Sequence, residues 1–461
     1  MSIFAKSTLL LIPVMMLFAC AEAKQAQPKP IDYEDFIEFI ETQNLAVKNN
    51  FIRDLKSNWL PEYTAMSLEA ARFSESYRSR RELLNLLKEK TGYRKAADLN
   101  DWYQWLWNRP ATINDQYADF KAELYRRIDP NFHRYFNDRQ ASSRIRLDEI
   151  RWGGVVRDGI PPLRNPEMIP AEQASYLQGS NIVFGVEING DARAYPKRIL
   201  AWHEMFTDTF GKGDNSEPIA GVYCTLCGTV IIYKTRHKGV DHQLGTSGFL
   251  YRSNKLMYDQ ETSSLWNTVR GEPVLGPLVD QGIALEHLSV VTTTWDEWQR
   301  RHPNTSVLSL RTGHNRDYGE GVAYQEYFST DRLMFNTPFS DKRLKNKREI
   351  LALRFPGAPN KQLAIDTEFL AERPVFYDQV GQQKFVVLTD KSGANRVYDP
   401  ADIKIERYDG LDTAIDSNGK SWRVTEQALI AEGQQALGRL PYHRAFWFGW
   451  HAAYPETRLI K

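Results

Sequence analysis

The chain has 461 residues, with 59 Lys and Arg against 58 Asp and Glu, and only 3 Cys. This length allows two or three domains, and the near-zero net charge argues against a dedicated nucleic-acid-binding protein, because such proteins usually present a basic face. Three cysteines are too few to hold a fold of this size together, so we expect its stability to come from core burial.

The first twenty residues have the pattern of an export signal. Lys6 supplies a positive charge, and residues 8–19 form an apolar run that is shorter than the ~20 residues needed to span a bilayer. The run ends in Leu-Phe-Ala-Cys20, which resembles the lipobox of bacterial lipoproteins, where cleavage precedes a cysteine that is then lipidated. Phe18 is bulkier than usual there, so an ordinary signal peptide is the alternative.

A lipidated Cys20 predicts attachment to a membrane through the N-terminal lipid. Ala21 rather than Asp follows the cysteine, which resembles lipoproteins sorted to the outer membrane. We therefore predict a lipoprotein signal peptide over residues 1–20 and a tether over residues 21–32. The chain is expected to be exported and anchored in the cell envelope, at the outer membrane facing the periplasm. The substrate, a small molecule or a protein, stays open.

Residues 33–150 carry the spacing of amphipathic helices. Apolar residues recur at helical intervals, as in the leucines of residues 83–87. Asp98 is placed to cap a helix that must stop before Pro110. No spacing typical of a metal or catalytic site stands out, so we predict a helical accessory domain with a solvated, charged surface.

From about residue 180 the spacing becomes that of strands. Asn189-Gly190 and Asn418-Gly419 each separate two strand-like runs, and Asn-Gly is a favoured dipeptide for a tight hairpin. Helices are few, with one short candidate over residues 295–301. We therefore predict an α+β fold, in which the helical region is followed by a large, mostly antiparallel β domain over residues 151–461.

The strongest chemical signal is the motif Tyr-Cys-Thr-Leu-Cys-Gly at residues 223–228. β-like runs on both sides predict a tight turn between two strands, with Gly228 in a left-handed conformation. A thioredoxin-type redox pair instead places its first cysteine at a helix N-terminus, where the helix dipole lowers the thiol pKa. The turn resembles a metal knuckle, half of a rubredoxin or zinc-ribbon site, which needs further ligands to be complete.

Two thiolates with one imidazole suit copper or zinc. His203 is the candidate third ligand, and Glu204 beside it is placed to orient the ring or accept its proton. We therefore hypothesise a metal site formed by Cys224, Cys227 and His203 and used for catalysis or metal handling. Two alternatives stay open. One is a thiol–disulfide oxidoreductase with Asp259 or His203 as base, and the other is a non-catalytic ligand-binding module with a static disulfide.

The segment from about residue 158 to the C-terminus resembles a bacterial and archaeal family known as domain of unknown function 3179. Its matching motifs follow in order: Asp-Gly-Ile-Pro at 158–161, Ala-Arg-Ala-Tyr-Pro at 192–196, Ala-Trp-His-Glu at 201–204, the cysteine motif, Leu-Tyr-Arg-Ser-Asn at 250–254, Met-Tyr-Asp at 257–259 and Ser-Leu-Trp at 264–266. The family name implies no reaction. Thr225 stands where proline is usual, which predicts a slightly looser turn.

The resemblance also adds candidate site residues, several of them polar or reactive. Asp259 and Tyr258 are the candidates for catalysis, with Asp259 as a base, a ligand or simply a turn residue. Four further side chains are expected to line the pocket or orient its ligands: Glu204, Asn254, Trp266 and Arg193. Arg193 either binds an anionic group or pairs with a carboxylate. His242, among polar residues, is expected at the surface.

Overall fold

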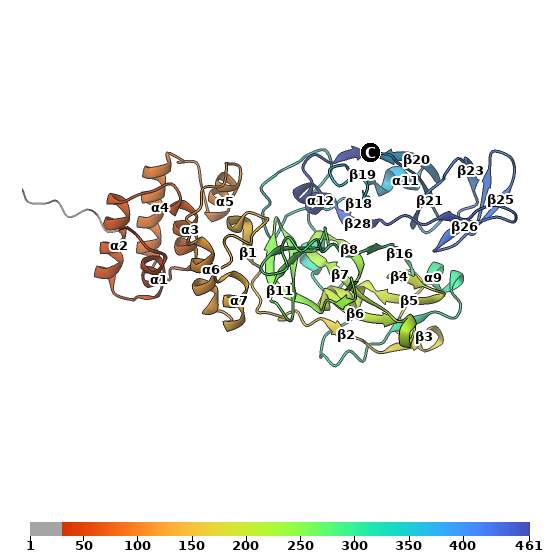
Figure 1. Cartoon of the computed structure of the whole chain (residues 1–461), viewed down its shortest axis with the longest axis horizontal. Coiled ribbons are helices and arrows are strands. Elements are labelled where there is room, and N and C mark those ends of the chain that lie inside the picture. The colour runs from red at the N-terminus through yellow and green to blue at the C-terminus, as the bar shows by residue number, and fades with distance from the viewer. Residues whose placement is uncertain (1–29) are drawn as a thin grey trace, which may run out of the picture.

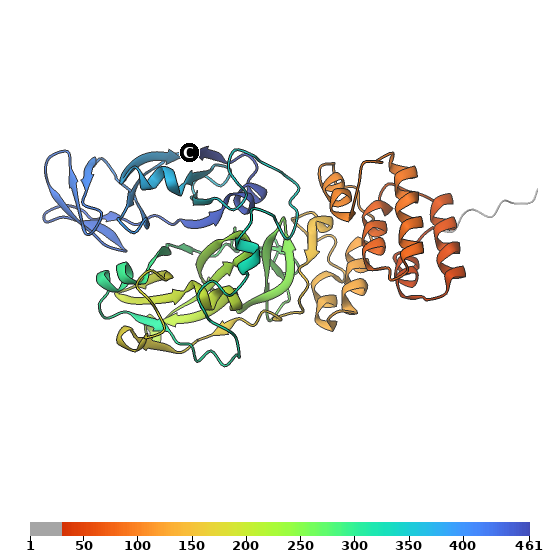
Figure 2. The same cartoon turned by 180° about the vertical axis from the view of Figure 1, so that it is seen from behind.

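The computed structural model describes residues 30–461. The predicted signal peptide, Cys20 and all but the last three residues of the predicted tether lie outside the described residues. The described chain is elongated, with the helices at one end and two β regions beside each other at the other end (Figures 1 and 2). The predicted α+β fold, with helices first and a large antiparallel-rich β region after them, is confirmed.

The N-terminal region consists of helices packed around aromatic side chains. The helices are α1 (Tyr33–Glu41), α2 (Leu45–Ser57), α3 (Tyr63–Phe73), α4 (Tyr77–Thr91), α5 (Leu99–Trp107), α6 (Tyr117–Arg126) and α7 (His133–Phe136). Asp98 caps α5 as expected, because its side chain accepts a hydrogen bond from the amide of Asp101.

The middle β region consists of three larger sheets. The first sheet has the strand order β1 (Ile150–Trp152), β11 (Leu244–Tyr251), β12 (Asn254–Asp259), β13 (Leu265–Asn267), β14 (Glu272–Leu275). The second sheet has the order β15 (His287–Leu288), β8 (Thr229–Lys234), β7 (Glu217–Cys224), β6 (Met205–Phe210), β2 (Leu163–Arg164). The third sheet has the order β16 (Val291–Thr294), β4 (Ile182–Ile188), β5 (Asp191–Pro196), β17 (Ser306–Leu308), β3 (Met168–Pro170). Strands β9 (Arg236–His237) and β10 (Val240–Asp241) form a small ribbon, and α8 (Lys197–His203) and α9 (Trp295–Arg301) flank the sheets.

The C-terminal β region also consists of three sheets. The first sheet has the strand order β28 (His443–Phe446), β18 (Glu349–Arg354), β19 (Gln362–Asp366), β29 (Arg458–Ile460). The second has the order β20 (Val375–Val380), β21 (Gln383–Thr389), β22 (Asn395–Tyr398). The third has the order β23 (Ile405–Tyr408), β24 (Thr413–Asp416), β25 (Ser421–Val424), β26 (Ala428–Ile430), β27 (Leu437–Gly438). Two helices, α11 (Thr367–Ala371) and α12 (Trp447–Ala453), accompany them. Residues 309–348, which contain only the short helix α10 (Gln325–Phe328), join the two β regions, and we call this segment the strap.

Both predicted Asn-Gly hairpins are present. Strands β4 and β5 pair in antiparallel register across Asn189 and Gly190, whose φ angles are 53° and 84°. Strands β24 and β25 pair in the same way across Asn418-Gly419. Positive φ at both central residues of the first turn is the conformation that twists two strands into a tight hairpin.

The helices and the first sheet of the middle β region share one hydrophobic core. Phe249 of β11 lies among the rings of Tyr125, Phe132, Tyr135 and Phe136, with ring centroids between 4.8 and 6.0 Å away. All four of these contacts are edge-to-face, an arrangement that aromatic quadrupoles favour. The helical region is therefore docked on the β region through a buried aromatic contact.

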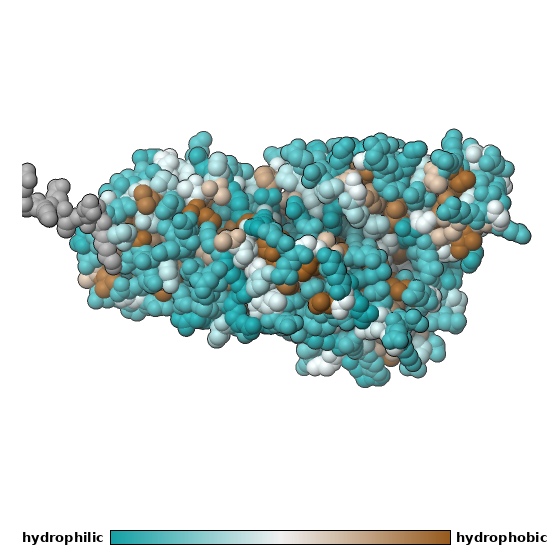
Figure 3. All heavy atoms as spheres, in the orientation of Figure 1, coloured by the Kyte–Doolittle hydropathy of each residue, from teal (hydrophilic) through white to brown (hydrophobic). Residues whose placement is uncertain are grey.

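The surface is mainly polar on the face that Figure 3 shows, with hydrophobic residues scattered singly or in small groups. Across residues 30–461, none of the helices combines the length and the apolar character that crossing a membrane requires.

Replacing Phe249 by Ala is expected to destabilise the contact between helices and sheet. Emptying this aromatic site should lower the free energy of unfolding by about 3–5 kcal/mol. Hydrogen exchange should show faster exchange in α6 and α7 together with β11. Phe376→Ala, at a half-buried site in the C-terminal β region, is the control. An equal loss of unfolding free energy in the two variants would contradict this role for Phe249.

Candidate functional site

The cysteine motif forms the predicted turn between two strands. β7 ends at Cys224, residues Thr225–Cys227 make a single 3₁₀ turn, and β8 begins at Thr229. Gly228 adopts the expected left-handed conformation with φ +56°. This single 3₁₀ turn is followed by a strand and not by an α-helix, so the α-helix dipole that lowers a thioredoxin-type thiol pKa is absent here.

Cys224 and Cys227 are bonded to each other as a disulfide. Cys224 is 3% exposed and Cys227 is fully buried, and both pack against Phe446 and Phe448 from the C-terminal β region. The approach is close, because a Cβ added at Gly449 of α12 would lie only 2.8 Å from the Cβ of Cys227. The disulfide therefore sits where the two β regions meet.

Both ring nitrogens of His203 have partners other than the cysteines. Its Nδ1 lies 2.8 Å from the carbonyl oxygen of Pro161, and its Nε2 lies 2.6 Å from the hydroxyl of Tyr318. Burial lowers the pKa of His203 to about 4, although the Pro161 carbonyl opposes this shift. The imidazole is therefore neutral at pH 7, and both of its nitrogens have protein partners.

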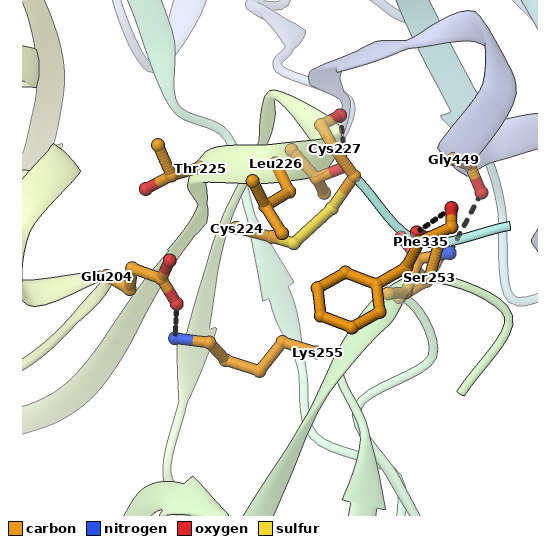
Figure 4. The surroundings of a disulfide bond; sticks show 12 residues. Glu204, Cys224, Thr225, Leu226, Cys227, Ser253, Lys255, Phe335 and Gly449 are labelled. Carbon is orange, nitrogen blue, oxygen red and sulfur yellow. Dashed lines mark hydrogen bonds and ion pairs between the residues drawn. A yellow bond between two sulfur atoms is a disulfide. The ribbon is translucent and has the colours of Figure 1, made fainter. Parts of the chain in front are cut away.

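Glu204, the next residue, is directed into the space below the disulfide (Figure 4). It follows α8 with φ +56° and forms an ion pair with Lys255 of β12, whose Nζ lies 2.5 Å from its Oε2. Each side chain is only 7% exposed. Burial lowers the pKa of Lys255, and the Glu204 carboxylate offsets part of that effect.

A small cavity lies between the disulfide and this ion pair. Its volume is about 90 Å³, and its walls include Cys224, Glu204 and Lys255. The rest of the lining is mostly apolar, with Ile160, Leu226, Phe249, Tyr324, Met334 and Phe335. Cys224 and a charged pair thus line the same mostly apolar space, where electrostatic interactions are stronger than in water.

Tyr258 and Asp259 lie elsewhere, each with partners of its own. The Tyr258 hydroxyl donates to Asp158 over 2.6 Å. Asp259 closes a turn by accepting hydrogen bonds from the amide and hydroxyl of Thr262, and its other oxygen lies 3.4 Å from His242. Burial opposes ionisation of Asp259, but hydrogen bonds from His242 and Thr262 outweigh it and lower the pKa. Neither residue lines the cavity, and their catalytic role stays a prediction.

His242 is buried, so its expected place at the surface is wrong. It follows the β9–β10 ribbon, which looked like an exposed polar stretch in the sequence. Its ring instead packs 5.1 Å from that of Trp266 and faces Asp259. Contact with a carboxylate from another strand makes this burial tolerable.

The remaining candidates are divided between the site and the core. Asn254 donates to the carbonyl of Gly449, which adjoins Cys227, so it supports the buried side of the disulfide. Trp266 is fully buried in a hydrophobic cluster with Met205 and Met257. Arg193 pairs with Asp191 at 2.7 Å and Asp208 at 2.8 Å, the second of its two predicted alternatives.

The proposed ligands Cys224, Cys227 and His203 are not gathered around one point. Within residues 30–461, no group of three or more His, Cys, Asp or Glu side chains is placed to hold a metal ion. The two sulfurs are bonded to each other, and the His203 nitrogens have other partners. The donors of this disulfide form do not fit a copper or zinc site.

Sequence reasoning missed Lys255 and the strap residues Tyr324, Met334 and Phe335. The sequence does hold a signal for Lys255, because a lysine inside a strand with Leu256, Met257 and Tyr258 must be buried or at an edge. No comparable signal marks the strap residues, since they meet the disulfide only through tertiary folding.

The fold and the site define an α+β protein with a buried cysteine pair at the junction of two β regions. Comparison with known families matches residues 157–457 to the family described as "Protein of unknown function (DUF3179)". The match covers well over half of the chain, and the protein belongs to this family. Comparison with curated proteins and with solved structures finds no match.

The depressed pKa of His203 predicts an acid-dependent loss of stability. The unfolded chain takes up a proton near the ordinary pKa of 6.5, whereas the folded chain does so near 4. Stability is therefore complete above pH 6.5 and falls as the pH drops to 4, by up to ~3 kcal/mol from this residue. His203→Gln cannot take up this proton, so its free energy of unfolding should fall less steeply over that range.

Urea unfolding at pH 4, 5, 6 and 7 measures this slope. His133→Gln, at a half-exposed histidine in the helical region, is the matched control and should keep the wild-type slope. A wild-type slope in His203→Gln would contradict the assignment.

Proposed function

We propose that this protein is a thiol–disulfide oxidoreductase whose Cys224–Cys227 pair exchanges electrons with a thiol substrate. The single observation that carries the proposal is the cavity, whose walls bring Cys224 together with the buried Glu204–Lys255 ion pair. Sulfur chemistry needs a group that manages protons and charge next to the reacting sulfur. This arrangement supports the oxidoreductase over the two other hypotheses drawn from the sequence.

A purely stabilising role accounts poorly for the site. In the chain-entropy view, a disulfide closing about four residues contributes only about 2 kcal/mol, against about 4.7 kcal/mol for a 100-residue loop. A buried ion pair also costs desolvation energy, and well-packed apolar residues are often as stable in its place. A short-range disulfide beside such a pair is a costly arrangement for stability alone, which favours a chemical role.

The proposed exchange proceeds in two balanced steps. A substrate thiolate attacks Sγ of Cys224, the S–S bond breaks, and its electron pair leaves on Sγ of Cys227, which then takes up a proton. A second substrate thiol attacks the substrate sulfur of the mixed disulfide and releases Cys224 as a thiolate. The substrate is oxidised to a disulfide and the cysteine pair is reduced by two electrons. A second thiol–disulfide couple returns the pair to the oxidised form.

Cys224 is assigned as the attacked sulfur because it lines the cavity and Cys227 does not. The ammonium of Lys255 stabilises the thiolate in this low-dielectric space, and the carboxylate of Glu204 accepts the proton of the incoming thiol. This pair takes the place of the helix dipole that activates a thioredoxin-type cysteine.

The copper or zinc site of Cys224, Cys227 and His203 stays a prediction for the reduced protein, in which two thiolates would be free to bind a metal. Metal analysis of reduced protein purified without a histidine tag tests it. Stoichiometric copper or zinc would favour metal handling over thiol exchange.

We also propose that the chain is exported and held at the outer membrane, facing the periplasm, by lipid on Cys20. The support is the sequence of residues 1–20. Labelled palmitate should enter the wild type and not Cys20→Ser. Equal labelling of both would contradict the anchor.

The oxidoreductase proposal predicts a disulfide that is easy to reduce. Full-length protein is equilibrated with mixtures of reduced and oxidised dithiothreitol, and the fraction of free Cys224 is measured by mass spectrometry. We expect a reduction potential above about −300 mV, because structural disulfides lie below that value. A lower potential in the folded protein would overturn the proposal in favour of the binding module with a static disulfide.

The ion pair predicts a kinetic effect. The double variant Glu204→Gln, Lys255→Met avoids leaving one buried charge unpaired. Its exchange rate at pH 7 should fall about 100-fold, the lower end for a positioned acid or base. The pH–rate profile should also move to higher pH, because the thiol must ionise without a neighbouring cation. Lys234→Met is the control and should keep the wild-type rate, because it breaks a half-exposed pair with Glu217 at the end of β7 and β8 opposite to the cysteine turn.

A further inference from the structure

The strap covers the disulfide. Phe328 and Leu333 pack on the same cluster as Cys224 and Cys227, and the hydroxyl of Tyr327 donates to the carbonyl of Leu226 over 2.7 Å. The strap has one short helix over residues 309–348, whereas unstructured connections longer than about 12–15 residues are uncommon and often functional.

Three residues of the strap help to close the cavity beside Cys224. Tyr324, Met334 and Phe335 form part of its wall, and Met334 is 54% exposed on its outer side. The backbone at Phe335 is held by a hydrogen bond from the hydroxyl of Ser253 to its carbonyl, 3.1 Å long. These side chains stand between solvent and the sulfur that the proposed exchange uses.

The strap is held differently at its α10 end and at Met334. On the α10 side, the Lys347 ammonium donates to the carbonyls of Tyr327 and Thr330 and lies 3.4 Å from the centre of the Tyr327 ring. At Met334 the side chain is largely in solvent. The α10 end is therefore tied to Lys347, whereas beside the cavity the backbone is held through the Ser253 bond to Phe335 and Met334 is 54% exposed.

We propose that the strap is a gate over Cys224 and that the cavity beneath it admits small, uncharged thiols. This inference rests on the proposed thiol–disulfide exchange and names its substrate class. Met334 and Phe335 are the gate residues, and the apolar walls are the selecting surface.

The volume of the cavity supports the limit on the size of the thiol. The cavity of about 90 Å³ equals the space of roughly three water molecules at about 30 Å³ each. That is room for a methyl or hydroxyethyl thiol, or for a single cysteine side chain, and too little for a charged tripeptide such as glutathione. The gate must open much further for a larger substrate.

The paired charges in the cavity wall also favour uncharged thiols. Glu204 and Lys255 neutralise each other at 2.5 Å, so the cavity offers no unpaired charge to a charged substrate. A sulfonate or carboxylate brought in with the thiol would lose its water without gaining a partner. An uncharged thiol avoids that cost.

Thiosulfonate reagents of different size and charge test the gate. In full-length Cys227→Ser, the Cys224 thiolate attacks the reagent sulfur, forms a mixed disulfide and releases a sulfinate. Methyl methanethiosulfonate is compared with its benzyl, sulfonatoethyl and trimethylammonium-ethyl analogues, with modification at Cys224 read by peptide mass spectrometry. After normalisation to free cysteine, the methyl reagent should react at least about 30-fold faster than the charged and bulky reagents.

Gate variants sharpen the test. Phe335→Ala should raise the rates of the bulky reagents about tenfold or more and change the methyl rate little. Phe339→Ala, on the strap but packed on His451 away from the cavity, is the matched control and should leave every rate unchanged. Wild type provides a measurement that needs no cysteine replacement: 2-mercaptoethanol should reduce its disulfide about 30-fold faster than glutathione at equal thiolate concentration.

The outcomes separate the two proposals. Equal normalised rates for all reagents would overturn the gate and leave thiol exchange standing. No reaction of folded Cys227→Ser even with the methyl reagent, together with no reduction of the wild type by 2-mercaptoethanol, would overturn the exchange itself.

Discussion

The close approach of α12 to the cysteine turn is the contact on which the rest of the site depends. Gly449 and Gly228 are both required there, because a Cβ at either position would lie 2.8 Å from Cys227 or from the Phe446 ring. Real Cβ contacts are longer than this, and Gly228 also needs its positive φ. The two β regions therefore meet at the disulfide, and both contribute to its packing.

This junction explains how charged groups come to lie beside the disulfide. Lys255 comes from the sheet that also carries Phe249 and the helical region, whereas Glu204 follows α8 next to the sheet of β7 and β8. Bringing the sheets together buries the two charges as a pair, which is tolerable only because they meet. The same closure leaves the small cavity that separates them from Cys224.

The strap and the helical region complete the burial from two other sides. The strap lies over the disulfide through Phe328 and Leu333, and Phe249 connects the helices to the sheet that lines the cavity. A cysteine pair that is almost inaccessible to solvent is protected from unselective oxidants and thiols. Its reactivity then depends on how the cover moves, which is where the proposed selectivity arises.

Local features of the sequence were enough to predict the elements. The Asn-Gly hairpins, the capped helix after Asp98 and the left-handed Gly228 all depend on neighbours a few residues away, and each is confirmed. The cysteine turn was also placed correctly between two strands.

Contacts made across the fold could not be predicted in this way. The sequence places Glu204 next to His203, yet the two side chains point in different directions, one to Lys255 and the other to Pro161 and Tyr318. The sequence by itself determined the turn and its two cysteines. Only the tertiary structure decided that they form a disulfide, that an ion pair and not an imidazole faces them, and that the strap covers them. The physical reason is that turns follow local φ, ψ and hydrogen bonding, whereas the partners of a buried side chain are set by which elements pack together.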